Sequence, residues 1–143
     1  MPSLKNKLSH CFAAGALGGL AYALAMWGMG ALGIAGALGV QMDPDMNAAF
    51  LCGKIVWGGI WGLILIFPVA SQRPWLKGLI MSLGPTLAQL FIIFPLTFDK
   101  GTMGLDLGAM TPFFIIVYNA LWGITAAYWH HEAAAGTAQP AIF

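Results

Sequence analysis

Apolar residues dominate four long stretches of the chain, and short polar segments separate them. The stretches cover about 12–39, 48–69, 75–97 and 111–129. Each is long enough to cross the ~30 Å hydrocarbon core of a bilayer, which takes about 20 helical residues. A lipid environment requires the backbone groups of such a span to be satisfied within the protein. The pattern therefore predicts an all-α integral membrane protein, a bundle of four transmembrane helices with short loops.

The first apolar stretch is longer than one span requires. A helix from Phe12 to Val40 would be roughly 43 Å long at 1.5 Å per residue, so we expect it to tilt, protrude or break near 28–36. A secretory signal is the alternative, because Lys5 and Lys7 precede the apolar run. That run exceeds the roughly 7–15 apolar residues of a signal peptide, which favours an uncleaved span.

The composition also favours the membrane. Hydrophobic residues make up 59% and charged residues 8% of the 143, whereas an ordinary soluble domain is about 25% charged. A net charge of +1 argues against nucleic acid as a partner, because nucleic-acid binding needs a clustered basic patch. The expected partner is the lipid bilayer. We expect residues 1–132 to form one transmembrane domain and residues 133–143 to form a mobile cytoplasmic tail.

Basic residues gather on one side of the predicted bundle. Lys5 and Lys7 precede the first span, and Arg73 and Lys77 flank the connection between the second and third spans. The opposite loops hold Asp43, Asp45, Asp99 and Asp106, with Lys100 as their one basic residue. Cytoplasmic loops are enriched in Lys and Arg, so both termini are expected in the cytoplasm. The Trp-Gly-Gly-Ile-Trp-Gly segment at 57–62 looks like small bacterial membrane proteins, and the expected location is a bacterial inner membrane.

Glycines at i, i+4 spacing predict close helix packing. Gly15 and Gly19 form such a pair in the first span, Gly58 and Gly62 form another in the second, and Gly123 lies in the fourth. In lipid, small residues allow helix backbones to approach one another. These faces could join the spans, join copies of the chain, or contact a larger membrane complex.

Polar residues in the third and fourth spans are expected at a common depth. Thr86 and Gln89 share one helix face, and Asn119 lies in the middle of the fourth span. In an antiparallel pair, Thr86 and Asn119 would lie at about the same depth. These three residues form either hydrogen bonds between helices, each contributing about 0.6 kcal/mol, or the polar wall of a substrate or ion pathway.

Lys54 lies about five residues inside the second span. Its ammonium group either extends to the outer interface or pairs with an aspartate of the outer loops. Pairing with Asp99 or Asp106 would place charged groups at an entrance.

The sequence contains few residues suited to catalysis or metal binding. No Ser/His/Asp set and no pair of carboxylates lies at membrane depth, and His130 and His131 are adjacent, so they point about 100° apart on a helix. Trp57 and Trp61 could stack a flat cofactor, but such a stripe more commonly packs against lipid or a helix. We therefore expect no enzyme activity, no metal and no cofactor.

The expected function is transport or channel activity by a homo-oligomer, because four short helices leave little room for a pathway within one protomer. The alternative is a non-catalytic structural or accessory subunit that packs against a larger membrane complex. A membrane enzyme is the third possibility. Transport predicts polar residues that converge on a cavity, whereas an accessory subunit predicts a bundle without one.

Overall fold

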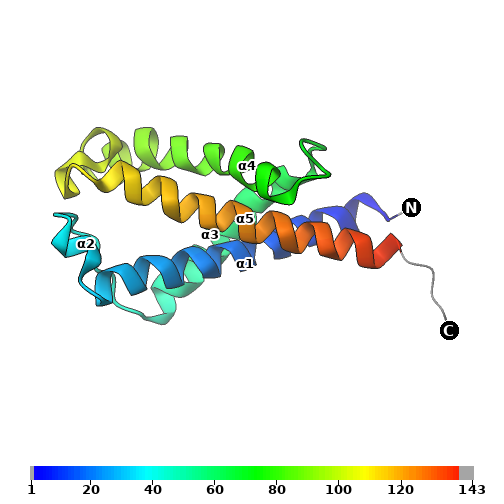
Figure 1. The fold of residues 1–143 in the computed structure, drawn as a ribbon, viewed down its shortest axis with the longest axis horizontal. Coiled ribbons are helices and arrows are strands. Elements are labelled where there is room, and N and C mark those ends of the chain that lie inside the picture. Colours follow the sequence, from blue (N-terminus) through cyan, green and yellow to red (C-terminus); the bar gives the residue numbers. More distant parts are fainter. Residues whose placement is uncertain (1, 139–143) are drawn as a thin grey trace.

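A computed structural model describes residues 2–138 of the chain, and within that range the regular structure is helical (Figure 1). The predicted fold class is confirmed, because four long apolar helices pack as a bundle and each is long enough to cross a membrane. These are α1 (Leu4–Ala31), α3 (Ala48–Gly62) continued by the 3-10 turn η1 (Leu63–Ile66), α4 (Pro74–Ala88) continued by the π-helix η2 (Gln89–Thr97), and α5 (Thr111–Ala138). Two short elements lie in the connections, α2 (Ile34–Ala37) and the 3-10 segment η3 (Thr102–Leu107).

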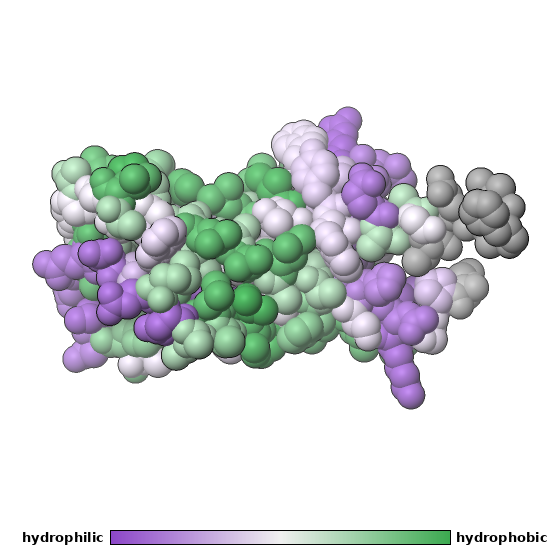
Figure 2. All heavy atoms as spheres, turned by 90° about the horizontal axis from the view of Figure 1, so that it is seen from below, coloured by the Kyte–Doolittle hydropathy of each residue, from purple (hydrophilic) through white to green (hydrophobic). Residues whose placement is uncertain are grey.

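The surface has the polarity expected of a membrane-spanning bundle. Figure 2 shows apolar side chains around the middle of the molecule and hydrophilic side chains gathered toward its two ends. Large apolar residues of the long helices, such as Leu83, Phe91 and Ile116, are exposed. Such a surface would favour aggregation in water but suits contact with lipid. The protein is therefore a small polytopic membrane protein.

Local chemistry sets where the helices begin and end. The Ser3 and Asn47 side chains accept hydrogen bonds from backbone N–H groups in the first turns of α1 and α3, as helix N-caps do. The first helix ends at Ala31 because Gly33 turns the chain with a positive φ of 75°. The last helix continues to Ala138, beyond the expected end at 129, through an alanine-rich segment that favours helix. The rest of the expected tail, 139–143, lies outside the described residues.

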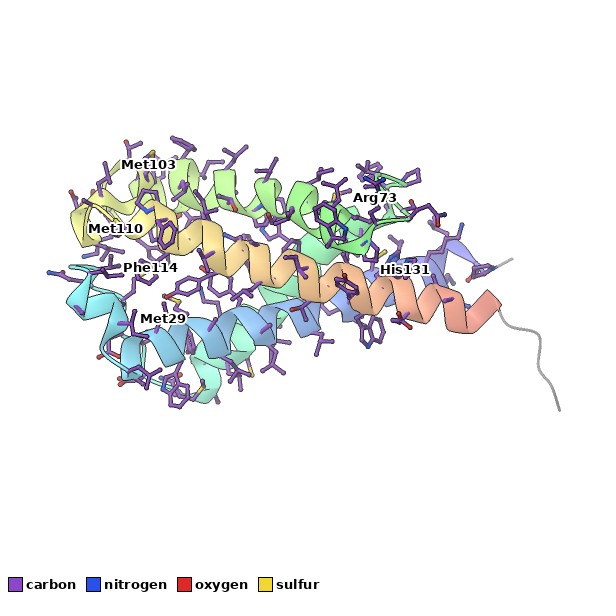
Figure 3. All side chains as sticks on the ribbon, in the orientation of Figure 1. Met29, Arg73, Met103, Met110, Phe114 and His131 are labelled. Atoms are coloured by element: carbon purple, nitrogen blue, oxygen red, sulfur yellow. The ribbon has the colours of Figure 1, made fainter. Side chains whose placement is uncertain are left out.

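The two ends of the bundle are formed by different segments of the chain. We call one the terminal end, because it holds the start of α1, the 67–73 connection and the end of α5, and the other the loop end, which holds α2, residues 39–47 and 98–110 (Figure 1). Figure 3 places Arg73 and His131 at the terminal end and Met103, Met110 and Phe114 toward the loop end.

Glycine contacts join neighbouring helices. Helix α1 packs against α3 and α5, and α4 packs against α5, which gives the order α3, α1, α5, α4 across the bundle. A Cβ placed on Gly15 would meet the Gly58 carbonyl oxygen and lie 2.5 Å from the Gly62 Cα. A Cβ on Gly78 of α4 would lie 2.6 Å from the Gly123 carbonyl oxygen of α5. The backbones of these helix pairs are therefore in direct contact.

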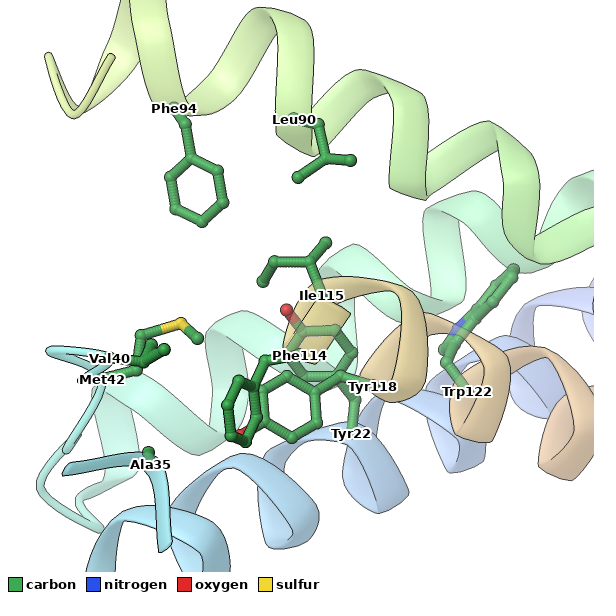
Figure 4. Close-up of a cluster of buried hydrophobic side chains, with 10 residues drawn as sticks. All are labelled: Tyr22, Ala35, Val40, Met42, Leu90, Phe94, Phe114, Ile115, Tyr118 and Trp122. Carbon is green, nitrogen blue, oxygen red and sulfur yellow. The ribbon is translucent and has the colours of Figure 1, made fainter. Parts of the chain in front are cut away.

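The core consists of two buried clusters of different character. The cluster toward the terminal end contains mostly small or narrow side chains: Cys11, Ala14, Leu65, Met81, Ala126 and Ala127. The cluster toward the loop end is larger and rich in aromatic rings (Figure 4): Tyr22, Ala35, Val40, Met42, Leu90, Phe94, Phe114, Ile115, Tyr118 and Trp122. Larger side chains hold helices further apart, so the loop half of the bundle is the wider half.

Candidate functional site

A cavity of about 760 Å³ lies in the loop half, between α3 on one side and α4 with η2 on the other. It extends from the level of Trp61, Pro85 and Trp122 near the middle of the bundle to residues 41–44 at the loop end. All four long helices contribute to its walls. Ligand pockets in proteins are typically concave spaces of roughly 300–1,000 Å³ with mainly apolar walls and a few polar groups, and this cavity matches that description.

Three hydrogen-bonded side chains from three helices line this cavity. Gln89 Nε2 lies 2.9 Å from the Tyr22 hydroxyl oxygen, to which it donates, and Asn119 Nδ2 donates to Gln89 Oε1 at 3.3 Å. Asn119 Nδ2 also donates to the Ile115 carbonyl of its own helix at 3.1 Å. We call Tyr22, Gln89 and Asn119 the polar trio. It connects α1, η2 and α5 inside a bundle where lipid offers no hydrogen-bond partner.

The position of Gln89 follows from a change in helix type. Gln89 is the first residue of the π-helix η2, which continues α4, and π-helical turns occur frequently at functional sites. Pro85, one turn earlier, has no N–H to donate to the Met81 carbonyl. The Thr86 hydroxyl does not bond to the Met81 carbonyl, because it donates to the Ser82 carbonyl at 2.6 Å. Thr86 is buried but does not line the cavity, so the structure brings together Gln89 and Asn119 and leaves Thr86 apart.

Lys54 projects into the same cavity. Its Nζ lies 4.6 Å from the centroid of the Tyr22 ring and 5.9 Å from that of Phe50, which are cation–π contacts. Among residues 2–138 its ammonium group forms no ion pair with a carboxylate. Gly19 lets α1 approach the backbone of α3 at this position, because a Cβ at Gly19 would meet the Lys54 carbonyl oxygen.

The structure does not bring the expected aspartates to Lys54. Asp99 and Asp106 lie outside the cavity lining, and the Asp106 carboxylate is beside Gly101. Asp43 does line the cavity at the loop end, but its Oδ1 lies close to Gly30 of α1. The Lys54 ammonium group therefore contacts the rings of Tyr22 and Phe50 and no carboxylate among residues 2–138.

Trp122 closes the cavity toward the terminal end. Its indole Nε1 donates to the Gly15 carbonyl at 3.1 Å and the Gly58 carbonyl at 3.3 Å. This pair of bonds ties α5 to the point where α1 and α3 cross. Trp61 also lines the cavity, and its buried Nε1 has no acceptor among the described residues.

The remaining predicted packing residues lie at helix contacts. Gly15, Gly19, Gly58 and Gly62 meet where α1 crosses α3, and Gly123 meets Gly78 between α5 and α4. The sequence reasoning missed Tyr22 and Trp122. Tyr22 had a usable signal: it lies at i+3 from Gly19 and i+7 from Gly15, on the helix face that those glycines mark.

The described residues offer no evident metal site. No group of three or more His, Cys, Asp and Glu side chains between residues 2 and 138 could hold a metal ion. Cys11 is buried in α1 and Cys52 is exposed on α3, and both are free thiols. The centre of the cavity therefore offers a phenol, two carboxamides, an ammonium group and several aromatic rings, and Gln41 and Asp43 add a carboxamide and a carboxylate at the loop end.

Comparisons of the chain with protein-family models, curated proteins and solved structures gave no match.

Proposed function

We propose that this protein is a transport-type membrane protein that binds a small solute in its cavity. The observation that carries the proposal is the convergence of polar groups from α1, α3, η2 and α5 on one cavity within the bundle. Polar side chains within a membrane span are costly and are typical of substrate pathways. An accessory subunit that acts only by packing does not need such a cavity.

The cavity suggests access from one side at a time. It extends to the loop end, whereas the glycine crossing of α1 and α3 and the indole of Trp122 close it toward the terminal end. Transport would then require the terminal half to separate. The weakest place for such a movement is between α3 and α4, because α1 meets both α3 and α5, and α4 meets α5, at glycine contacts with backbone atoms, whereas α3 and α4 share no such contact among the described residues.

The proposal places the site within a single protomer. Four short helices favour a pathway between copies, but this cavity lies inside one chain. A homo-oligomer would therefore carry one site in each copy. We propose a bacterial inner membrane as the location, with both termini in the cytoplasm, from the Lys and Arg residues near the terminal end.

We propose binding without catalysis. Two of the four polar groups at the centre of the cavity, Gln89 and Asn119, are carboxamides that do not titrate. General acid–base catalysis instead relies on groups with a pKa near the working pH. The Asn119 amide also donates a hydrogen bond to the Gln89 amide oxygen.

A blocked cavity tests the proposal. Gly53 lines the cavity and a Cβ there would meet no atom within 4 Å, so Gly53→Phe should place a ring in the cavity. Gly28 is equally open but lies outside the cavity lining, so Gly28→Phe is the matched control. Each purified protein is heated with carboxylates, amines, amino acids, sugars and lipids, and the unfolding midpoint is recorded.

At least one solute class should raise the midpoint of the wild type and Gly28→Phe but not that of Gly53→Phe. Proteoliposomes that contain the wild type should then take up the same solute. If no class stabilises the wild type, or if Gly53→Phe responds as strongly as the wild type, the cavity is not a solute site and the proposal is wrong.

A further inference from the structure

We propose that the ligand of the cavity is an amphipathic monoanion, with its anionic group at Lys54 and its apolar body along the aromatic walls. This inference rests on the proposed function and names the substrate class for the same site.

The first step is the charge of Lys54. Its ammonium group lies within a membrane-spanning helix, in contact with the faces of Tyr22 and Phe50. Aromatic faces attract a cation, but they do not neutralise it, and a charge within a span is costly without a counter-charge. No carboxylate between residues 2 and 138 forms an ion pair with it. An anionic ligand would supply that counter-charge.

The second step is an independent hydrogen-bond donor in the same cavity. The Trp61 Nε1 is buried and no described residue accepts its hydrogen bond. Trp61 follows Lys54 by seven residues on α3, so the two side chains share a helix face, about 10.5 Å apart along the axis. A single carboxylate is much shorter than this separation, so the Lys54 ammonium binds the anionic group and the Trp61 indole is a separate hydrogen-bond donor farther along the cavity.

The third step is the character of the walls. Phe50, Trp57, Ile93 and Phe94 line the cavity around the polar groups. A fully polar anion would lose its hydration against these walls without compensation. A ligand with an apolar body would bury it there and gain the hydrophobic free energy of that contact.

Two other ligand classes fit the site less well. A cation would be repelled by Lys54. A zwitterion would need a second charged partner, and Asp43 is the carboxylate in the cavity lining, but its Oδ1 lies beside Gly30 at the loop end. A substitution of Asp43 is therefore included in the experiment below.

Quenching of tryptophan fluorescence by a brominated ligand measures binding directly. The probes are dodecanoate with a terminal bromine, its methyl ester, and the trimethylammonium compound of equal chain length. Each is titrated into the full chain in nanodiscs at a pH where the carboxylate is ionised. Competition by unbrominated dodecanoate separates saturable binding from partition into lipid. We expect the carboxylate to bind at least about tenfold more tightly than the ester, and the cation not to bind saturably.

Substitutions of Lys54 test the site itself. Lys54→Met should lower the affinity for the carboxylate by about tenfold or more and leave the affinity for the ester within about twofold, which also shows that the variant is folded. Lys54→Arg should retain carboxylate binding. Lys100→Met is the matched control, because Lys100 is exposed at the loop end and lies outside the cavity lining. Asp43→Asn should bind the carboxylate as the wild type does.

Several results would overturn the inference. Equal binding of carboxylate and ester by the wild type would exclude recognition of an anion. An equal loss of carboxylate binding in Asp43→Asn and Lys54→Met would show that the loss is not specific to Lys54, which would exclude Lys54 as the partner of the anion. No saturable binding of any probe would also refute the amphipathic monoanion. The proposed function is tested separately, by whether any solute class stabilises the wild type and whether Gly53→Phe abolishes that effect.

Discussion

Two tyrosines in contact differ in their hydrogen bonds. The rings of Tyr22 and Tyr118 lie 5.4 Å apart between their centroids. The Tyr22 hydroxyl pairs with Gln89, whereas the buried Tyr118 hydroxyl has no partner among residues 2–138. A buried polar group without a partner costs about 1–3 kcal/mol. The two hydroxyls should therefore have opposite effects on stability.

We expect Tyr118→Phe to leave the free energy of unfolding unchanged or to raise it by about 1 kcal/mol, because it removes the unpaired hydroxyl. Tyr22→Phe should lower it by about 0.6 kcal/mol, the average for a hydrogen bond between membrane helices. Unfolding in mixed micelles with increasing denaturing detergent measures both. A loss in Tyr118→Phe as large as that in Tyr22→Phe would show that the Tyr118 hydroxyl does have a partner.

Asn119 distinguishes a packing role from a binding role. Asn119→Leu should cost about 0.6 kcal/mol, because it removes the hydrogen bond to Gln89. Asn119→Asp places a carboxylate in the same cavity as Lys54, where it would supply the counter-charge. We expect Asn119→Asp to fold and to lose saturable binding of brominated dodecanoate. A variant that unfolds in the same micelles would instead indicate that Asn119 is enclosed by packing alone.

At the level of residues, the sequence predicts which polar groups need partners but not every partner. Gln89 and Asn119 stand out because a carboxamide within a span must bond to protein. Thr86 shares their depth, but a threonine hydroxyl can bond to the carbonyl four residues earlier in its own helix, and it does so here. Tyr22 and Trp122 occupy positions that the hydropathy pattern assigns to apolar residues. Their hydrogen bonds depend on where the helices cross.

At the level of helices, the glycine crossings are the closest contacts. A Cβ on Gly15 would overlap the backbone of α3, whereas a Cβ on Gly28 would meet nothing within 4 Å. Both glycines lie in α1, so one helix provides a substitution and its control.

We expect Gly15→Ala to lower the free energy of unfolding by about 1–3 kcal/mol, the usual cost of overpacking. Gly28→Ala should raise it by up to about 1 kcal/mol, because alanine favours helix more than glycine does. Denaturing-detergent titrations measure both, and equal stability of the two variants would show that α1 and α3 are not in backbone contact at Gly15.

The helix boundaries show what periodicity cannot supply. The apolar pattern continues past residue 31, but the backbone turns at Gly33 because glycine readily adopts a positive φ. The apolar pattern of the sequence also did not predict that η2 is a π-helix. It follows from how the turns after Pro85 are hydrogen-bonded, which the apolar pattern does not record.

At the level of the whole molecule, both ends of the described chain lie at the terminal end (Figure 1). Lys5, Lys7 and Arg73 belong to this end of the bundle. We expect the terminal end to face the cytoplasm. A reporter that is active only in the periplasm should be silent when fused after Phe143, and the same reporter inserted after Asp45 should be active. An active C-terminal fusion would reverse the orientation of the protein.

The bundle was predictable from the sequence, whereas the cavity was not. Span number and apolar character follow from composition and length, which hydropathy reports directly. A cavity depends on the distance between helices, and that distance results from large rings in the loop half combined with glycines in the terminal half.

The pairing of neighbours along the chain has a consequence for biogenesis. Helices α1 and α3 leave the ribosome first, and their glycines can bring them together before α4 and α5 are made. The second hairpin brings Gln89 and Asn119, which bond to each other. Among residues 2–138, Tyr22 and Trp122 form side-chain hydrogen bonds between the two hairpins, and these bonds can form only after both hairpins are inserted. The contacts within each hairpin can therefore form before the hairpins meet, and the ligand cavity is the last part of the protein to form.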